Sequence, residues 1–195
     1  MAVARLDGQE PIGGLNGRTL MEFWSWAFSD VLVNTTRGVF AEYLVGEALG
    51  VTEQARVEWD AVDLRYGGFS IEVKSAAYCQ SWEQSSPSTI RFDIAKKLSW
   101  HADSNTSDEQ SSRSADCYVF CLYAEEDRAS ARRNVLDASC WRFYVVPRSK
   151  LDRSFGTQKG VALSRIEEIA TAVPFADLKG RVDAVLGSLK GINCR

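Results

Sequence analysis

The chain has 195 residues, 45% of them hydrophobic and 25% charged, which is the composition of an ordinary globular protein and argues against wholesale disorder. Its formal net charge of -3 argues against an unspecific cationic surface for nucleic acid or membrane. The single histidine, His101, excludes zinc sites that need two or three histidine ligands, and its polar surroundings do not suggest a Ser-His-Asp triad. The composition therefore favours chemistry based on carboxylates, lysine or a bound metal.

Cysteine usage and the N-terminal segment indicate the compartment. The five cysteines are an odd number and include no Cys-x-x-Cys pair, so we expect free thiols that pack as small hydrophobic residues. The first residues contain no apolar signal core, and no apolar run is long enough to span a membrane. These features predict a reduced, cytoplasmic protein that does not act at a membrane.

The N-terminal part of the chain predicts an arm and two helices. Residues 1–18 are polar and contain glycines, so we expect a flexible arm. Apolar residues recur at helical spacing from Leu20 to Val33, and a second helix is predicted from Arg37 to Leu49, with Gly50 as its stop. The second helix is apolar on almost every side, which is typical of a buried helix, so Glu42 within it lacks a local polar partner.

A β-hairpin follows the second helix. Two runs of strand type, Val57–Tyr66 and Phe69–Ala77, are joined by Gly67-Gly68, a strong signal for a two-residue turn. This turn aligns Asp63 with Glu72, about 5 Å apart between Cβ atoms. Period-2 alternation then predicts one face that carries the charged residues Asp63, Glu72 and Lys74, and an opposite apolar face that carries Val62, Leu64, Ile71 and Val73.

The rest of the chain predicts further strands and helices around a sheet. Residues 101–115 contain no large apolar side chain and are interpreted as a mobile loop. Cys117–Tyr123 is apolar on both faces, which is typical of a central strand, and Trp141–Val146 is another strand. Helical patterns cover Ser164–Thr171 and Phe175–Leu189. Without a repeat or a linker, we expect one α/β domain spanning all 195 residues.

The facing acids need a counter-charge. Two carboxylates directly opposite each other destabilise a sheet, and Mg²⁺ prefers such oxygen ligands. The alternative is a solvated salt-bridge cluster in which Asp63 and Glu72 surround Lys74. Long apolar strands indicate a sheet covered on both sides, where a buried charge is costly unless it is paired. The sequence therefore favours a cation site over a surface cluster.

The order of these residues resembles a known enzyme superfamily. Glu42 on a helix, then Asp63, then Glu72-Val73-Lys74 across a hairpin is similar to the PD-(D/E)XK nuclease superfamily. A wider pattern, covering most of the chain, resembles a group of uncharacterised bacterial proteins; it comprises Arg37-Gly38, Ala41-Glu42, Ala48-Leu49-Gly50, Trp59-Asp60, Ile71-Glu72-Val73-Lys74-Ser75 and Gln80-Ser81-Trp82. The resemblance implies a restriction-endonuclease-like fold of the α/β class, with a central mixed β-sheet flanked by helices.

The resemblance also implies roles for the site residues. Asp63 and Glu72 would be metal ligands together with the carbonyl of Val73, and Glu42 would be a ligand through water or to a second metal. Lys74 would activate or orient the attacking water and stabilise the transition state. The implied chemistry is Mg²⁺-dependent hydrolysis of a phosphodiester, with the cation as a Lewis acid and Mn²⁺ able to substitute.

Gln80 and Asp60 complete the implied site. Gln80 lies where many members carry a polar residue after the Glu-x-Lys strand and would orient Lys74 or a phosphate. No proline precedes Asp63, and Asp60 is a second candidate ligand. The register favours Asp63, because Asp60 has the same phase as Val62, whereas a bulge near Trp59 would favour Asp60.

The implied function is that of a nuclease, endo- or exonucleolytic, acting on nucleic acid, with DNA favoured, in bacterial defence, restriction or repair. A homodimer or a larger defence complex would suit this role. Basic residues later in the chain are candidate phosphate contacts: Lys96, Lys97, Arg132, Arg133, Arg142, Arg148, Lys150 and Arg153. Trp82 and Trp100 are candidates for base stacking, although core packing is favoured for both.

Two alternatives remain. One is a catalytically silent module on the same fold that binds nucleic acid or protein, which the joint presence of Asp63, Glu72 and Lys74 disfavours. The other is an α/β protein whose acids form a structural ion network.

Overall fold

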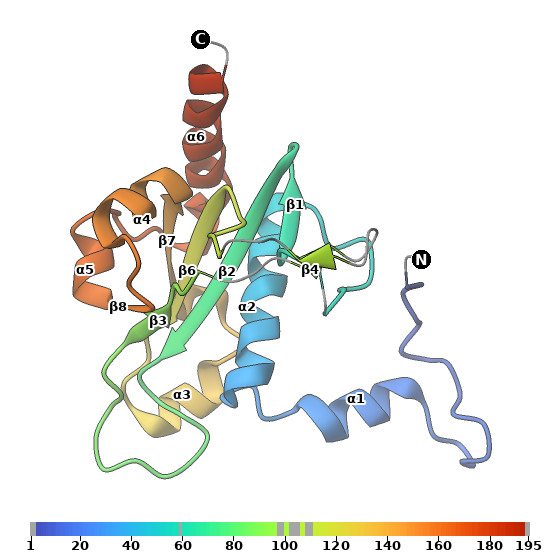
Figure 1. Ribbon diagram of the computed structural model, residues 1–195. Coiled ribbons are helices and arrows are strands. Elements are labelled where there is room, and N and C mark those ends of the chain that lie inside the picture. The colour runs from blue at the N-terminus through green and yellow to red at the C-terminus, as the bar shows by residue number, and fades with distance from the viewer. Residues whose placement is uncertain (1–2, 59, 97–99, 102–105, 108–110, 194–195) are drawn as a thin grey trace.

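A four-stranded mixed sheet forms the centre of the molecule (Figure 1). The computed structural model describes residues 3–58, 60–96, 100–101, 106–107 and 111–193. The strand order is β1-β2-β6-β7, where β2 pairs antiparallel with β1 and parallel with β6, and β6 pairs antiparallel with β7. The strands are β1 (Leu64–Tyr66), β2 (Phe69–Ala77), β6 (Cys117–Tyr123) and β7 (Trp141–Pro147).

Helices and a small sheet cover the two faces. On one face lie α2 (Asn34–Leu49) and α6 (Phe175–Asn193). The other face is covered by α4 (Arg148–Phe155), α5 (Leu163–Glu167) and the antiparallel pair of β3 (Arg91–Asp93) and β8 (Gly160–Ala162). The α/β class with a central mixed sheet flanked by helices is therefore confirmed. The remaining elements are α1 (Leu20–Phe28), α3 (Arg128–Asn134), the 3-10 turn Ala138–Cys140, and the paired segments β4 (Trp100–His101) and β5 (Thr106–Ser107).

The sheet separates two hydrophobic cores. Odd-numbered residues of β6, such as Val119, pack with α2 and α6, whereas even-numbered residues such as Phe120 pack with α4, α5 and the small sheet. All seven residues of β6 are buried, which confirms the predicted central strand. On β2, Ile71 and Val73 face the first core, so the alternating positions Glu72 and Lys74 face the side of the second core.

The two-residue turn and the C-terminal end of α2 agree with the sequence prediction, whereas α2 is buried on one face only, because Val39 and Tyr43 are 42% and 46% exposed. Gly67 and Gly68 have φ angles of 58° and 84°, a region that only glycine enters without strain, and β2 begins directly after them. Gly50, with φ of 70°, ends α2. The pairing of Leu64 with Ile71 is the predicted register.

The first strand of the hairpin is shorter than predicted. The prediction of a strand from Val57 is wrong, because regular pairing begins only at Leu64. The apolar face predicted for Val62 and Leu64 together is also wrong: Val62 belongs to the second core, and Leu64 packs against the first. Period-2 alternation does not extend to a segment that is not in a strand conformation.

The N-terminal helix stands apart from both cores. None of the residues of α1 is buried, and Trp26 is 84% exposed. Figure 1 shows α1 projecting from the body of the molecule, ahead of α2. The helix ends at Phe28 rather than at the predicted Val33. The preceding arm reaches the body through the guanidinium of Arg5, which donates a hydrogen bond to the carbonyl of Thr52 at 3.0 Å.

The segment predicted as a mobile loop is fastened at its C-terminal end. Residues 102–105 and 108–110 lie outside the described residues, as do Trp59, Lys97 and Cys194. Arg113 is buried and donates to the carbonyls of Ile94, Gly156 and Gln158 and to the carboxylate of Asp152.

Among the described helices, none has the length and apolar character needed to cross a membrane.

Candidate functional site

Asp63 lies at the point where β1 gives way to irregular chain. The ladder between β1 and β2 ends at Leu64 and Ile71, so β2 continues beyond it with no strand of the described residues paired to that edge. The N–H of Val73 donates to Oδ2 of Asp63 at 2.7 Å, so the carboxylate replaces the missing strand partner. The carbonyl of Val73 points to the same edge, because both polar groups of a strand residue lie on one side.

Glu72 and Lys74 form an ion pair beside this edge. The two residues are separated by one position on β2 and share a face, and Nζ of Lys74 lies 2.5 Å from Oε1 of Glu72. Their side chains are only 14% and 18% exposed. Limited access of water strengthens their attraction compared with a pair on the open surface.

Glu42 approaches the site from α2 and has a partner that the sequence did not reveal. The guanidinium of Arg56 binds both carboxylate oxygens of Glu42, at 2.5 and 3.0 Å. The expectation that Glu42 lacks a local partner is therefore wrong. Arg56 belongs to an irregular segment after α2, and no periodic pattern links it to Glu42, so only the folded chain reveals this pair.

These charges converge on Asp63. Burial raises the pKa of the Asp63 carboxyl from 3.8 to about 6, and repulsion by Glu72 and Glu42 adds to this rise. The N–H of Val73 and the charge of Lys74 oppose the rise. The carboxylates of Glu42 on α2 and Glu72 on β2 are therefore close enough to Asp63 for their charges to disfavour its ionisation.

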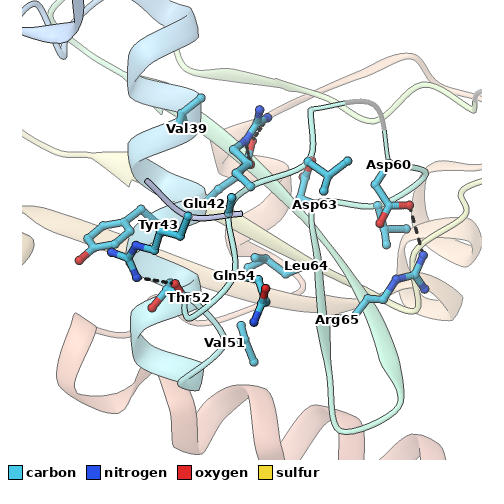
Figure 2. A pocket seen from close by; sticks show the side chains of 15 residues that line it. Val39, Glu42, Tyr43, Val51, Thr52, Gln54, Asp60, Asp63, Leu64 and Arg65 are labelled. Atoms are coloured by element: carbon cyan, nitrogen blue, oxygen red, sulfur yellow. Dashed lines mark hydrogen bonds and ion pairs between the residues drawn. The ribbon is translucent and has the colours of Figure 1, made fainter. Parts of the chain in front are cut away.

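Asp60 lies on the other side of Asp63. The carboxylate of Asp60 accepts a hydrogen bond from Arg65 at 3.3 Å, in a more exposed position. Figure 2 shows Asp63 between Glu42 and Asp60. The geometry thus favours Asp63 over Asp60 as the central acid, through its bond to Val73.

Gln80 is engaged elsewhere. Its side-chain oxygen accepts a hydrogen bond from the buried guanidinium of Arg37 at 3.1 Å, and its amide donates to the carbonyl of Ala77 at 2.8 Å. These bonds tie the end of β2 to the first turn of α2. The structure does not bring Gln80 to Lys74, so the implied role in orienting that lysine has no support in the contacts of its side chain.

The predicted phosphate contacts do not form one surface. Arg132 and Arg133 lie on α3, whereas Arg148, Lys150 and Arg153 lie on α4, and β7 separates these helices along the chain, so they lie at opposite ends of the sheet (Figure 1). Lys96 and Arg142 lie on neither helix. Lys97 and the side chain of Trp100 are outside the described residues.

The prediction of core packing is wrong for Trp82 but confirmed for two of the cysteines. Trp82 is 55% exposed, so the preference for core packing is wrong for this residue. Cys117 and Cys121 are free and buried in the first core, as predicted, and burial raises the pKa of the Cys117 thiol to about 12. A thiol held in its protonated form is a packing group rather than a nucleophile.

The acids are arranged as ion pairs in this structure. Within the described ranges, no group of three or more His, Cys, Asp or Glu side chains is positioned to hold a metal ion. Arg56 and Lys74 take two of the three carboxylates. The chain matches no protein family, no curated protein and no solved structure with which it was compared.

Proposed function

We propose that this protein is a metal-dependent nuclease with a restriction-endonuclease-like fold, which hydrolyses phosphodiester bonds of nucleic acid, with DNA as the favoured substrate. The observation that supports the proposal most is the convergence of Glu42 and Glu72 on Asp63, beside a backbone carbonyl at an open strand edge. Its place in bacterial defence, restriction or repair in the cytoplasm, alone, as a homodimer or in a larger complex, belongs to the same proposal.

The donor set suits a hard divalent cation. Carboxylate oxygens and a carbonyl are the ligands that Mg²⁺ and Mn²⁺ prefer, and the repulsion felt at Asp63 is the charge that such a cation relieves. Asp63, Glu72 and the carbonyl of Val73 would hold the ion, with Glu42 at its outer side. A bound Mg²⁺ would supply Lewis-acid chemistry at the phosphate.

The residues of the chain would divide the remaining work. Lys74 can donate from Nζ to a phosphate oxygen and stabilise the negative charge that grows in the transition state. Glu72 fixes the position of Lys74 through their ion pair. The N–H of Val73 binds Oδ2 of Asp63, and Oδ1 of the same carboxylate takes no part in that hydrogen bond.

A catalytically silent binding module is the second candidate. It is favoured by the two ion pairs, because Arg56 and Lys74 already satisfy Glu42 and Glu72 without a metal. In that case the acids would have a structural role, and cations would not compete with Arg56 for Glu42.

Cleavage assays with matched variants separate these candidates. Mg²⁺ or Mn²⁺ is expected to support cleavage in a screen of single-stranded, duplex, branched and modified DNA and of RNA. Lys74→Ala should abolish cleavage, whereas Lys190→Ala, at an exposed position of α6, should leave it unchanged. Calorimetric titration should show Mn²⁺ binding that disappears in Asp63→Ala. Cleavage that survives in Lys74→Ala would exclude the mechanism, and absence of both binding and cleavage would favour the silent module.

A further inference from the structure

A pocket opens directly beside the candidate site. It has a volume of about 500 Å³ and lies between α2, the irregular chain at 51–57 and the start of the hairpin at 60–65 (Figure 2). Glu42 and Asp63 are part of its wall, so a group bound in the pocket would lie next to the acids. Its volume falls in the range of sites for single small ligands rather than that of a groove for a duplex.

The lining of the pocket is largely apolar, although the pocket is open to solvent. Val39, Tyr43 and Val57 are 42%, 46% and 53% exposed. The other apolar residues of the lining are Val51, Ala55, Val62 and Leu64. Apolar side chains that surround an accessible hollow favour a ligand with flat apolar faces. The ring of Tyr43, which stacks on Phe40 with centroids 6.4 Å apart, offers such a ligand an aromatic surface.

Arginines lie around the same pocket. Arg5, Arg56 and Arg65 are among its lining residues, and they are paired with the carbonyl of Thr52, with Glu42 and with Asp60. Guanidinium groups bind phosphate oxygens in a bidentate manner. An apolar hollow, an aromatic ring and arginines are together complementary to one nucleotide, with its base inside and its phosphate towards the arginines.

We propose that this pocket receives one unpaired nucleotide of the strand that is cleaved, so that the substrate carries a single-stranded segment at the Asp63 site. This inference rests on the proposed function and specifies its substrate. A base in a duplex is stacked on both faces and must leave the stack to enter, which costs free energy of unstacking and unpairing that a single strand does not incur. Single-stranded nucleic acid is therefore favoured over continuous duplex.

Tyr43 allows a test that leaves the proposed catalytic residues intact. The binding probes are a fluorescein-labelled oligothymidylate of about ten nucleotides and a closed hairpin duplex, in EDTA and, in the Lys74→Ala background, with Mn²⁺. Tyr43→Ala should weaken binding of the oligothymidylate by about fivefold to a hundredfold, while Tyr43→Phe retains it. Trp26→Ala, which removes an exposed aromatic ring on α1 that does not belong to the pocket lining, is the matched control and should have no effect.

Binding of the duplex should be weak and should not change in Tyr43→Ala. The inference fails if the duplex binds as tightly as the single strand, or if Tyr43→Ala leaves the affinity for the oligothymidylate unchanged while far-ultraviolet circular dichroism shows an intact fold. Failure of the nuclease proposal gives a different result, since loss of metal-dependent cleavage leaves the effect of Tyr43→Ala on single-strand binding measurable in EDTA.

Discussion

The Asp63 carboxyl illustrates how a buried acid can reduce stability. Burial and the neighbouring acids raise its pKa from 3.8 to about 6, so the folded chain binds this proton more tightly than the unfolded chain. For an acid whose pKa is raised on folding, the free energy of unfolding falls as the pH rises from about 4 through about 6. At neutral pH the metal-free protein therefore holds a buried negative charge at Asp63 that lowers its stability, and a bound cation would offset this loss.

Asp63→Asn should stabilise the metal-free protein at neutral pH. The amide oxygen can still accept the hydrogen bond from Val73, while the buried charge is removed. We expect the free energy of unfolding in EDTA to rise by about 2 to 3 kcal/mol at pH 7.5 and to change little at pH 4, where the folded wild-type carboxyl is already protonated. Urea unfolding curves at the two pH values test this, and a variant less stable than wild type at pH 7.5 would contradict it.

Arg56 should compete with a cation for Glu42. Because its guanidinium occupies both oxygens of that carboxylate, Arg56→Gln frees the carboxylate and removes a positive charge near Asp63. On the proposed function, the affinity for Mn²⁺ should rise by about threefold to tenfold in calorimetric titration. The matched control is Arg65→Gln, whose partner is the more exposed Asp60. Unchanged or weaker Mn²⁺ binding in Arg56→Gln would show that Glu42 does not face the ion.

Among the elements, the hairpin shows what sequence patterns can and cannot predict. The glycine pair, the strand after it and the register follow from local rules, because turn chemistry and alternation act over a few residues. The irregular chain before Leu64 could not be predicted in this way, since its path depends on contacts distant in sequence. The bond from Val73 to Asp63 and the pairing of Arg56 with Glu42 are such contacts. The sequence pattern therefore predicted that Asp63 and Glu72 lie near each other, but it placed them on one strand face, whereas the structure places Asp63 at the edge of β2.

The exposure of α1 predicts that this helix adds little to stability. None of its residues is buried, so a variant without residues 1–28 loses few core contacts. The free energy of unfolding should fall by less than about 1 kcal/mol and the melting temperature by less than about 4 °C. Leu44→Ala in the buried face of α2 is the positive control and should cost about 2 to 5 kcal/mol. A comparable loss after removal of α1 would mean that the helix packs on the body in solution.

At the scale of the whole molecule, the central sheet couples the two cores. Residues on opposite faces of β6 belong to different cores, so neither core can lose its packing while the strand stays buried. Because the two cores share β6, we expect one cooperative unfolding transition, although the helices of each core contact the sheet from opposite sides. It is also the arrangement that holds the open edge at Asp63 in place, because β2 is fixed by its parallel pairing with β6.

Two buried side chains test this coupling. Leu178→Ala on α6 empties space in the first core, and Ile166→Ala on α5 does so in the second; both residues are fully buried. Each should destabilise by about 2 to 5 kcal/mol and move the whole transition, followed by both far-ultraviolet circular dichroism and tryptophan fluorescence. Leu136→Ala, at a site 66% exposed, should leave it in place. Two separate transitions, each moved by only one of the variants, would show that the cores unfold independently and that the sheet does not transmit stability to the edge at Asp63.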